Sequence, residues 1–262
     1  MATTDVHCSK PLLDIHVGDE LGEGLPRIIY IRDFGGFGND AVSVAAPDLS
    51  STSGRAAAGM ALRAAFSDLN LPRPMAIQVG CVPAECESEV RSIIEEHFEC
   101  GLSFVGKMEA RRFTAPIPSQ VPVPPDGEEL RLEQVNQLGH ELETWLAEAL
   151  APRGYPRCYI DYLIASEAVV APFVAVNSAG KAIGMVLQEA SDLSLGALHV
   201  DENMRGKGVG TWLLNHMSNA IFEKHGLAAT SMVEPDNDIS KHLHLRANWS
   251  MDDEPLVWLA FT

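Results

Sequence analysis

The sequence predicts an α/β protein with a mixed sheet, and the prediction rests on a strand, a loop and a helix in the second half of the chain. Residues 195–200 are almost continuously apolar, which is typical of a short buried strand. A glycine-rich loop follows at 205–210, and apolar residues then recur at helical spacing from Val209 to Ile221. This order predicts an anion site, because the backbone N–H groups of glycines can approach phosphate oxygens at a helix N-terminus.

The glycine loop does not fit two common phosphate-binding patterns. A dinucleotide fingerprint needs its third glycine at a different spacing, and a P-loop needs Ser or Thr directly after Lys207. The loop does contain Arg-x-x-Gly-x-Gly, formed by Arg205, Gly208 and Gly210, with Thr211 in the first helical turn. This pattern resembles the pyrophosphate loop of the GNAT superfamily of acyl-CoA-dependent N-acetyltransferases.

A second motif lies at the distance that this resemblance requires. Asn237 and Ser240 match an Asn and a small residue of the family pattern. His244 stands where the family carries a Tyr, and Asn248-Trp249 stands where it carries Gly-Phe. The resemblance implies that acetyl-CoA or another acyl-CoA is the co-substrate and that these residues bind it: Leu198, His199, Val200, Arg205, Gly206, Lys207, Gly208, Val209, Gly210, Thr211, Asn237 and Ser240.

The composition predicts a globular protein that is neither a membrane protein nor a nucleic-acid binder. The chain has 262 residues, 46% of them hydrophobic, and a formal net charge of −17, which opposes contact with phosphate backbones. It has no run of about 18 apolar residues and no secretory signal pattern. Its five cysteines form no Cys-x-x-Cys pair. We therefore expect a cytoplasmic protein without a metal site.

A proline-rich segment at 115–127 predicts a semi-rigid linker, because proline lacks the N–H group that helices and sheets need. It separates an N-terminal α/β domain, 1–114, from a second domain, 128–262. The first domain contains predicted strands and helices at these positions: strands 27–33, 41–46, 75–79 and 107–113, helices 58–69 and 90–98, and a turn at 35–40.

The order of these elements from 41 to 113 is strand, helix, strand, helix, strand, as it is from 195 to 261. We infer a degenerate GNAT-like copy that has lost its phosphate loop, with an unrelated α/β cap as the alternative. The second domain is predicted to contain a strand, two helices, a hairpin and the strand–loop–helix unit, followed by a strand and a helix. That order resembles a complete GNAT domain.

Acyl transfer to an amine needs a base for the amine and an acid for the leaving thiolate. Many GNAT enzymes carry the base on the strand before the loop, where this chain has Gly196 and Ser194. Neither can take a proton. The remaining candidates are Glu189, Asp192, His199, Glu202 and Glu234, and we favour Glu189.

The acid in the family is the Tyr that His244 replaces. Histidine titrates near about pH 6.5 and can donate a proton in its cationic form. The alternative is a helix-face histidine that packs under Trp249.

The resemblance implies an N-acyltransferase that moves an acetyl or short acyl group from acyl-CoA to a primary amine. The two-part layout and Trp258 resemble glycine N-acyltransferase-like proteins. An acceptor with a carboxylate would need a cation, for which Arg153, Arg157 and Arg246 are the candidates. The alternatives are an acyl-CoA-binding protein without turnover, and a structural partner without affinity for CoA.

Overall fold

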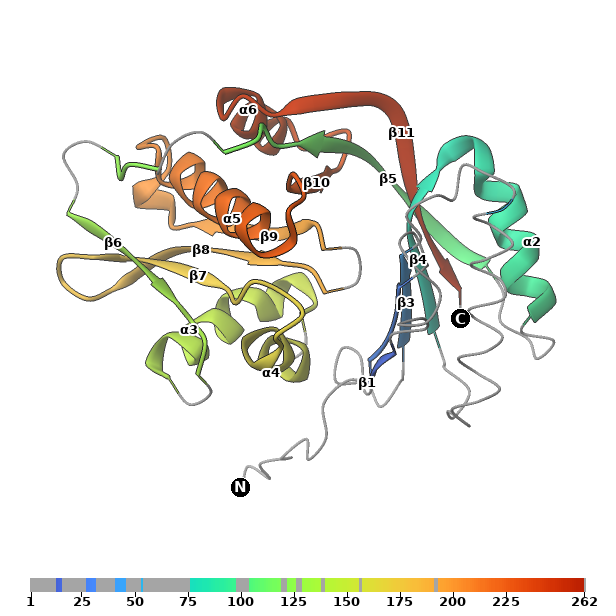
Figure 1. The fold of residues 1–262 in the computed structure, drawn as a ribbon, viewed down its shortest axis with the longest axis horizontal. Coiled ribbons are helices and arrows are strands. Elements are labelled where there is room, and N and C mark those ends of the chain that lie inside the picture. Colours follow the sequence, from blue (N-terminus) through green and yellow to red (C-terminus); the bar gives the residue numbers. More distant parts are fainter. Residues whose placement is uncertain are drawn as a thin grey trace, which may run out of the picture.

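The computed structural model describes these residues of the chain: 13–15, 27–31, 41–45, 53, 76–97, 104–118, 122–125, 129–137, 140–155, 157–190 and 193–261. The strands among them form one mixed sheet of 11 strands in the order β1-β2-β3-β4-β11-β5-β10-β9-β8-β7-β6. Figure 1 shows α3, α4 and α5 around the sheet of the second half and α2 on the opposite side of the molecule. The predicted α/β class with a mixed sheet is confirmed.

The first half contains five strands and one long helix among its described residues: β1 Leu13–Ile15, β2 Arg27–Ile31, β3 Ala41–Ala45, β4 Ala76–Pro83, the short helix η2 Ala84–Cys86, α2 Glu87–His97 and β5 Phe104–Thr114. All four predicted strands and the second predicted helix are therefore present. The predicted helix at 58–69 and the turn at 35–40 lie outside the described residues. β2 and β3 pair antiparallel, and β3 and β4 pair parallel.

The second half contains the elements predicted for it, with shifted boundaries: β6 Leu130–Gln134, α3 Glu141–Leu150, η3 Ala151–Arg153, α4 Arg157–Ala165, β7 Phe173–Asn177, β8 Ala182–Gln188, β9 Leu195–Val200, η4 Glu202–Met204, α5 Val209–His225, β10 Thr230–Val233, α6 Asp238–Arg246 and β11 Ser250–Phe261. Strands β6 to β9 pair antiparallel in sequence order, and β10 pairs parallel with β9.

The two halves exchange their last strands. β11, from the second half, lies between β4 and β5, so that Val257 pairs with both Val82 and Glu109. β5, from the first half, lies between β11 and β10, so that Phe113 pairs with both Met251 and Ser231. In Figure 1 these two long strands cross the centre of the molecule side by side. Each half is thus completed by a strand of the other.

Two buried clusters cover opposite faces of the second-half sheet. One packs α3 and α4 against it through residues such as Leu146, Ile160 and Met185. The other packs α5 against it and contains Phe113 of β5, which is fully buried. Burying a phenylalanine side chain is worth about 1.5–3 kcal/mol. The first half therefore contributes directly to the core of the second.

Helix α5 begins and ends at glycines in the left-handed conformation. Gly208 caps its N-terminus with φ 88°, and Gly226 caps its C-terminus with φ 68°. A side chain is strained at such angles, whereas glycine is not. At Gly210 a Cβ atom would come within 3.3 Å of Leu243 and 3.7 Å of Leu198. Gly210 thus lets the start of α5 lie close to both β9 and α6.

Candidate active site

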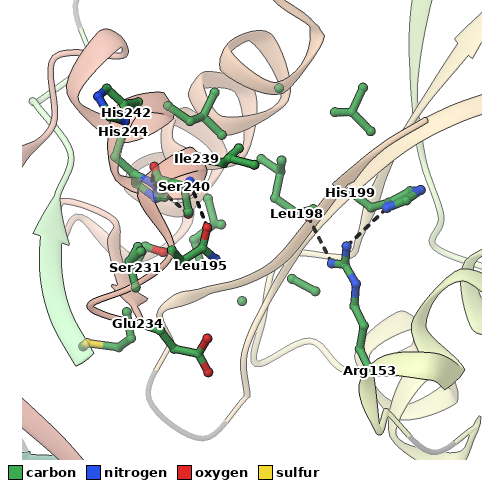
Figure 2. A pocket seen from close by; sticks show the side chains of 18 of the residues that line it. Arg153, Leu195, Leu198, His199, Ser231, Glu234, Ile239, Ser240, His242 and His244 are labelled. Atoms are coloured by element: carbon green, nitrogen blue, oxygen red, sulfur yellow. Dashed lines mark hydrogen bonds between the residues drawn. The ribbon is translucent and has the colours of Figure 1, made fainter. Parts of the chain in front are cut away.

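A cleft of about 1220 Å³ opens where β9 and β10 separate. The two parallel strands pair at a single position, Ser231 with Leu195, and diverge beyond it. Residues of β9, β10, the glycine loop, α6 and the segment around η3 line the cleft, together with Met108 of β5 and Trp258 of β11. Figure 2 shows His199 and Arg153 on one side of the opening and Glu234 and Ser231 on the other.

The edge of β9 that faces this opening presents backbone groups of Leu198 and Val200. The N–H of Asp201 donates to the carbonyl of Ile183 on β8, so Asp201 faces away from the cleft. Neighbouring residues of a strand alternate in the direction of their backbone groups, so Val200 and Leu198 face the opening. Their carbonyls accept hydrogen bonds from the guanidinium groups of Arg205, at 3.1 Å, and Arg153, at 3.0 Å. The N–H groups of the same two residues point in the same direction.

The glycine loop joins β9 to α5 at one end of the cleft. Gly206 and Gly208 both have positive φ, and a Cβ atom at Gly206 would meet nothing within 4 Å. A Cβ atom at Gly208 would lie 3.5 Å from Pro125 of the linker. The loop is therefore open toward solvent, with the N-terminus of α5 behind it, and could hold a phosphate group.

Most of the residues predicted to bind CoA line this cleft: Leu198, His199, Val200, Arg205, Gly206, Gly208, Gly210, Thr211, Asn237 and Ser240. Two others do not line it. Val209 is buried in the core, and the ammonium of Lys207 lies 3.8 Å from the sulfur of Met204. The side chain of Asn237 accepts a hydrogen bond from the N–H of Ser240 at 3.1 Å, so it caps α6.

Glu189 lies in the cleft beside β9. Between Leu198 and Leu195, β9 advances three residues while its partner β8 advances two, which is the signature of a β-bulge. Within this bulge Gly196 has no side chain, and a Cβ atom built on it would overlap the carboxylate of Glu189. The carboxylate therefore occupies the space that a side chain at 196 would take.

Two tyrosine hydroxyls hold this carboxylate. Tyr155 donates to Oε1 of Glu189 at 2.5 Å, and Tyr159 donates to Oε2 at 2.7 Å. Burial and the nearby carboxylate raise the pKa of Tyr159 well above its usual value, so its hydroxyl keeps its proton. The N–H of Ala190 donates to the Tyr159 oxygen at 3.0 Å. Sequence reasoning missed both tyrosines, since their ring positions depend on how η3, α4 and the residues between them pack against the end of β8.

Arg153 reaches the cleft from η3, the turn between α3 and α4. Besides the carbonyl of Leu198, its guanidinium contacts Nδ1 of His199 at 3.2 Å (Figure 2). Burial, then the charge of Arg153, lower the pKa of His199, although Asp201 opposes the shift. His199 is therefore neutral near pH 7. Arg157 differs from Arg153, because it pairs with Glu143 and Asp161 on the helices behind the cleft.

The other candidate bases have different surroundings. Glu234 lines the cleft on the β10 side. Glu202 is strongly exposed and lies 3.7 Å from Arg205. Asp192 lies outside the described residues. Glu189 is thus the candidate carboxylate that lies directly against the bulge of β9.

His244 lines the cleft but is only 3% exposed. Its Nδ1 lies 2.7 Å from the carbonyl oxygen of Ser240, to which it donates, while Nε2 is buried without a hydrogen-bond partner. Burial lowers its pKa, and the bond to Ser240 opposes this only in part. The ring packs against Phe113 and Trp249, each with its centroid 5.0 Å away. Near neutral pH the ring is therefore neutral, and its single N–H, on Nδ1, donates to the carbonyl of Ser240.

Met108 and Trp258 are site residues that come from the two exchanged strands. They pair directly across β5 and β11 and both line the cleft. The sequence carries no local signal for Met108, because its place depends on β5 joining the sheet of the other half.

Within the described part of the chain, no group of three His, Cys, Asp or Glu side chains is arranged to hold a metal ion. The described helices include none that is long and apolar enough to cross a membrane.

Part of the second half matches a known family model. Residues 136–249 match the model of the acetyltransferase (GNAT) family. The matched segment contains the cleft, the glycine loop and α6, and it ends just before the exchanged strand β11.

Solved structures share the fold of both halves of the chain. A Drosophila protein aligns with 96% of this chain and 78% of its own, with a TM-score of 0.60 and 15% identity. A putative GNAT-family acetyltransferase from Novosphingobium aromaticivorans aligns with 92% of this chain and 89% of its own, with a TM-score of 0.51 and 11% identity. At these identities the likeness establishes the fold alone. Comparison with curated proteins gives no match.

Proposed function

We propose that the protein transfers an acetyl or short acyl group from acyl-CoA to a primary amine. The observation that carries this proposal is the open edge of β9, with the glycine loop at one end and the Glu189 carboxylate at the other. An extended pantetheine chain pairs with such an edge as an added strand does. The GNAT domain at 136–249 supports the same reaction class.

The cofactor is placed by backbone groups more than by side chains. The CoA pyrophosphate binds the N–H groups of the glycine loop and the start of α5, with Arg205 nearby. The pantetheine amides pair with Leu198 and Val200. An N–H group of this edge then lies near the thioester carbonyl and stabilises the oxyanion that forms on it.

The reaction forms an amide bond and breaks a thioester bond. Glu189 takes a proton from the ammonium of the acceptor, directly or through water. The neutral amine attacks the thioester carbon, and the tetrahedral intermediate expels the CoA thiolate. An acid then returns a proton to sulfur, which leaves an amide and free CoA.

His244 is proposed as this acid, as its position in the family pattern implies. It can donate toward the cleft only when Nε2 carries a proton, and its burial opposes that state. The acid role therefore requires that Nε2 of His244 carry a proton when the thiolate leaves. The packing alternative makes no such demand, since the ring already fills the space between Phe113 and Trp249.

We further propose an acceptor that carries a carboxylate, as in glycine N-acyltransferase-like proteins. Arg153 supports this, because its guanidinium lies in the cleft on neutral partners, Leu198 and His199. A guanidinium has five N–H donors, so donors remain for a carboxylate. Arg157 is less suitable because Glu143 and Asp161 already neutralise it.

The first half, in this proposal, is a GNAT-like copy without a phosphate loop, joined through the linker at 115–127 to the GNAT domain at 128–262. The arrangement of β2, β3 and β4 supports a copy, because β8, β9 and β10 pair in the same way. The unrelated α/β cap remains the competing interpretation.

The test is release of free thiol from acetyl-CoA in the presence of single amines. We expect turnover with at least one amino acid, and a much lower rate with the matching amine that lacks the carboxylate. If CoA binds but no amine gives thiol, the non-catalytic binder is the correct function. If CoA does not bind, the structural-partner alternative stands.

A further inference from the structure

The cleft carboxylate lies at the end of a different strand from the one expected, because Glu189 directly follows β8. The position on β9 where many GNAT enzymes carry the base is Gly196, and β8 leads instead into Glu189. A Cβ atom at 196 would lie 2.8 Å from both Cγ and Cδ of Glu189 and would overlap its Oε1. One position therefore cannot carry a side chain while the other carries a glutamate in this conformation.

Holding a carboxylate there needs support, because the chain turns sharply after β8. Glu189 and Ser194 close that turn through a backbone hydrogen bond of 2.8 Å. The hydroxyls of Tyr155 and Tyr159 fix the two carboxylate oxygens separately. Two donors on two oxygens restrict rotation about the last torsion of the side chain, which is otherwise broad.

The two tyrosines are themselves held in place. The rings of Tyr155 and Tyr159 stack with centroids 6.1 Å apart, and Tyr162 continues the stack at 6.4 Å. Tyr159 is 5% exposed, and its oxygen also accepts the hydrogen bond from Ala190. Its hydroxyl is thus fixed from both sides, which leaves it one direction in which to donate.

We propose that Tyr155 and Tyr159 are positioning residues that hold Glu189 in the space vacated by Gly196, so that a carboxylate from β8 does the work of one on β9. The inference rests on the proposed function, in which Glu189 is the base. It predicts that the carboxylate can be moved between the two strands, because only its location in the cleft matters.

The first experiment removes the hydroxyls singly. Tyr159→Phe and Tyr155→Phe should lower kcat by about tenfold or more while leaving KM for acetyl-CoA nearly unchanged. The acid limb of the pH–rate profile should move to higher pH, because a carboxylate with fewer hydrogen bonds is protonated more easily. Tyr162→Phe is the matched control, since it removes the hydroxyl of the next ring in the stack. A positioning role is refuted if Tyr159→Phe and Tyr162→Phe give the same kcat and the same profile.

The second experiment relocates the carboxylate. Glu189→Ala should lower kcat by about a hundredfold or more, as loss of a general base does. Gly196→Glu alone should also be slow, because the two side chains overlap. The double variant Glu189→Ala/Gly196→Glu should recover at least tenfold of the lost rate. A double variant that folds, binds acetyl-CoA and stays as slow as Glu189→Ala overturns the inference.

Glu189→Ala separates failure of the proposed base from failure of the positioning role. If Glu189→Ala turns over like the wild type, Glu189 is not the base, and the inference falls with that part of the proposed function. If Glu189→Ala is slow but neither the tyrosine variants nor the double variant behave as expected, only the inference falls. Near- and far-ultraviolet circular dichroism of each variant separates loss of fold from loss of the hydrogen bonds.

Discussion

The two halves of the molecule share one strand arrangement but differ in how tightly its central parallel pair is closed. In the first half, β3 and β4 stay paired over four positions, from Ala41 with Ala76 to Val44 with Val79. In the second half, β9 and β10 pair only at Ser231 and Leu195. Each pair has an antiparallel neighbour on one side and the exchanged strand of the other half on the far side.

The cleft therefore comes from the separation of β9 and β10, and the shared strand arrangement alone does not produce it. β9 has a bulge at Gly196 in its pairing with β8 and is followed by the glycine loop, whereas β3 pairs with its antiparallel neighbour β2 without a register shift. A closed pair uses its backbone groups within the sheet. An open pair leaves them outside the sheet, and here the backbone groups of Leu198 and Val200 face the cleft, where their carbonyls accept from Arg153 and Arg205.

The largest expected effect comes from separating the halves. Residues 128–262 alone lack β5, which lies between β10 and β11 and places Phe113 in the core. Loss of one buried phenylalanine typically costs about 3–5 kcal/mol, against a total stability of about 5–15 kcal/mol. We expect this fragment to be unfolded or insoluble by circular dichroism and to recover when 1–127 is co-expressed. A stable fragment that binds acetyl-CoA would show that the halves are separable units.

The next effect tests whether CoA binds in the second half only. Gly208→Glu should abolish CoA binding in calorimetry. Any side chain is strained at the left-handed backbone angles of residue 208, and the added carboxylate would repel the pyrophosphate. Gly180→Glu is the matched control. Gly180 has φ 80° and open space around its Cβ position, in the turn between β7 and β8. Remaining CoA affinity in Gly208→Glu would point to a second site and would end the contrast between the halves.

A smaller effect is expected at His244, where β5 of the first half meets α6. If His244 is the thiolate acid, His244→Phe should lower kcat by about a hundredfold while CoA affinity is kept. His244→Tyr should restore much of the rate and extend the alkaline limb of the profile, since a phenol holds its proton to about pH 10. Equal kcat for His244→Phe and the wild type would leave His244 as packing against Phe113 and Trp249.

The smallest effect is the response of the second half to acid. Burial is the first cause that lowers the pKa of His199, His216 and His244. The unfolded chain therefore takes up these protons first as the pH falls, so stability is complete above about pH 6.5 and declines below it.

All four tryptophans lie in residues 128–262, so their fluorescence reports on that half and, through Trp258 of β11, on the strands of the first half that pair with β11. Urea unfolding followed by fluorescence should show a lower midpoint at pH 5.5 than at pH 7.5. The decline should be smaller in His244→Phe. An unchanged midpoint in the wild type would contradict the expected linkage.

The sequence predicts the elements of the second half well, because their apolar periods and turn residues are local. The helix after Gly208 and the strand at 195–200 follow from spacing alone. The exchange of β5 and β11 could not be predicted, because the pattern of a strand does not indicate which other strand it pairs with. Residues 107–113 were predicted as the last strand of the first domain, and the structure pairs this strand, β5, with β10 and β11 of the second half.

The same limit applies to the cleft. The sequence shows that Gly196 stands where the family pattern has a carboxylate, and it offers Glu189, a short distance before it, as a candidate base. The carboxylate of Glu189 occupies the side-chain space of residue 196 because of a bulge in β9. This bulge shifts the register by one residue and leaves no clear trace in composition. The tyrosine hydroxyls that hold Glu189 depend on the packing of α4. The loop was predictable because glycine at positive φ is a local requirement.

The exchanged strands also set an order of events during synthesis. β11 ends at Phe261, later in the chain than every other described strand, yet it lies in the middle of the sheet between β4 and β5. Until residues 250–261 leave the ribosome, β4 lacks one of its neighbours. Unpaired strand edges are prone to misassociation. A growing chain must therefore keep the edge of β4 free of wrong partners from the synthesis of β4 until residues 250–261 emerge. A chaperone that covers strand edges would be needed over that whole interval, which is longer than in a protein whose halves close one after the other.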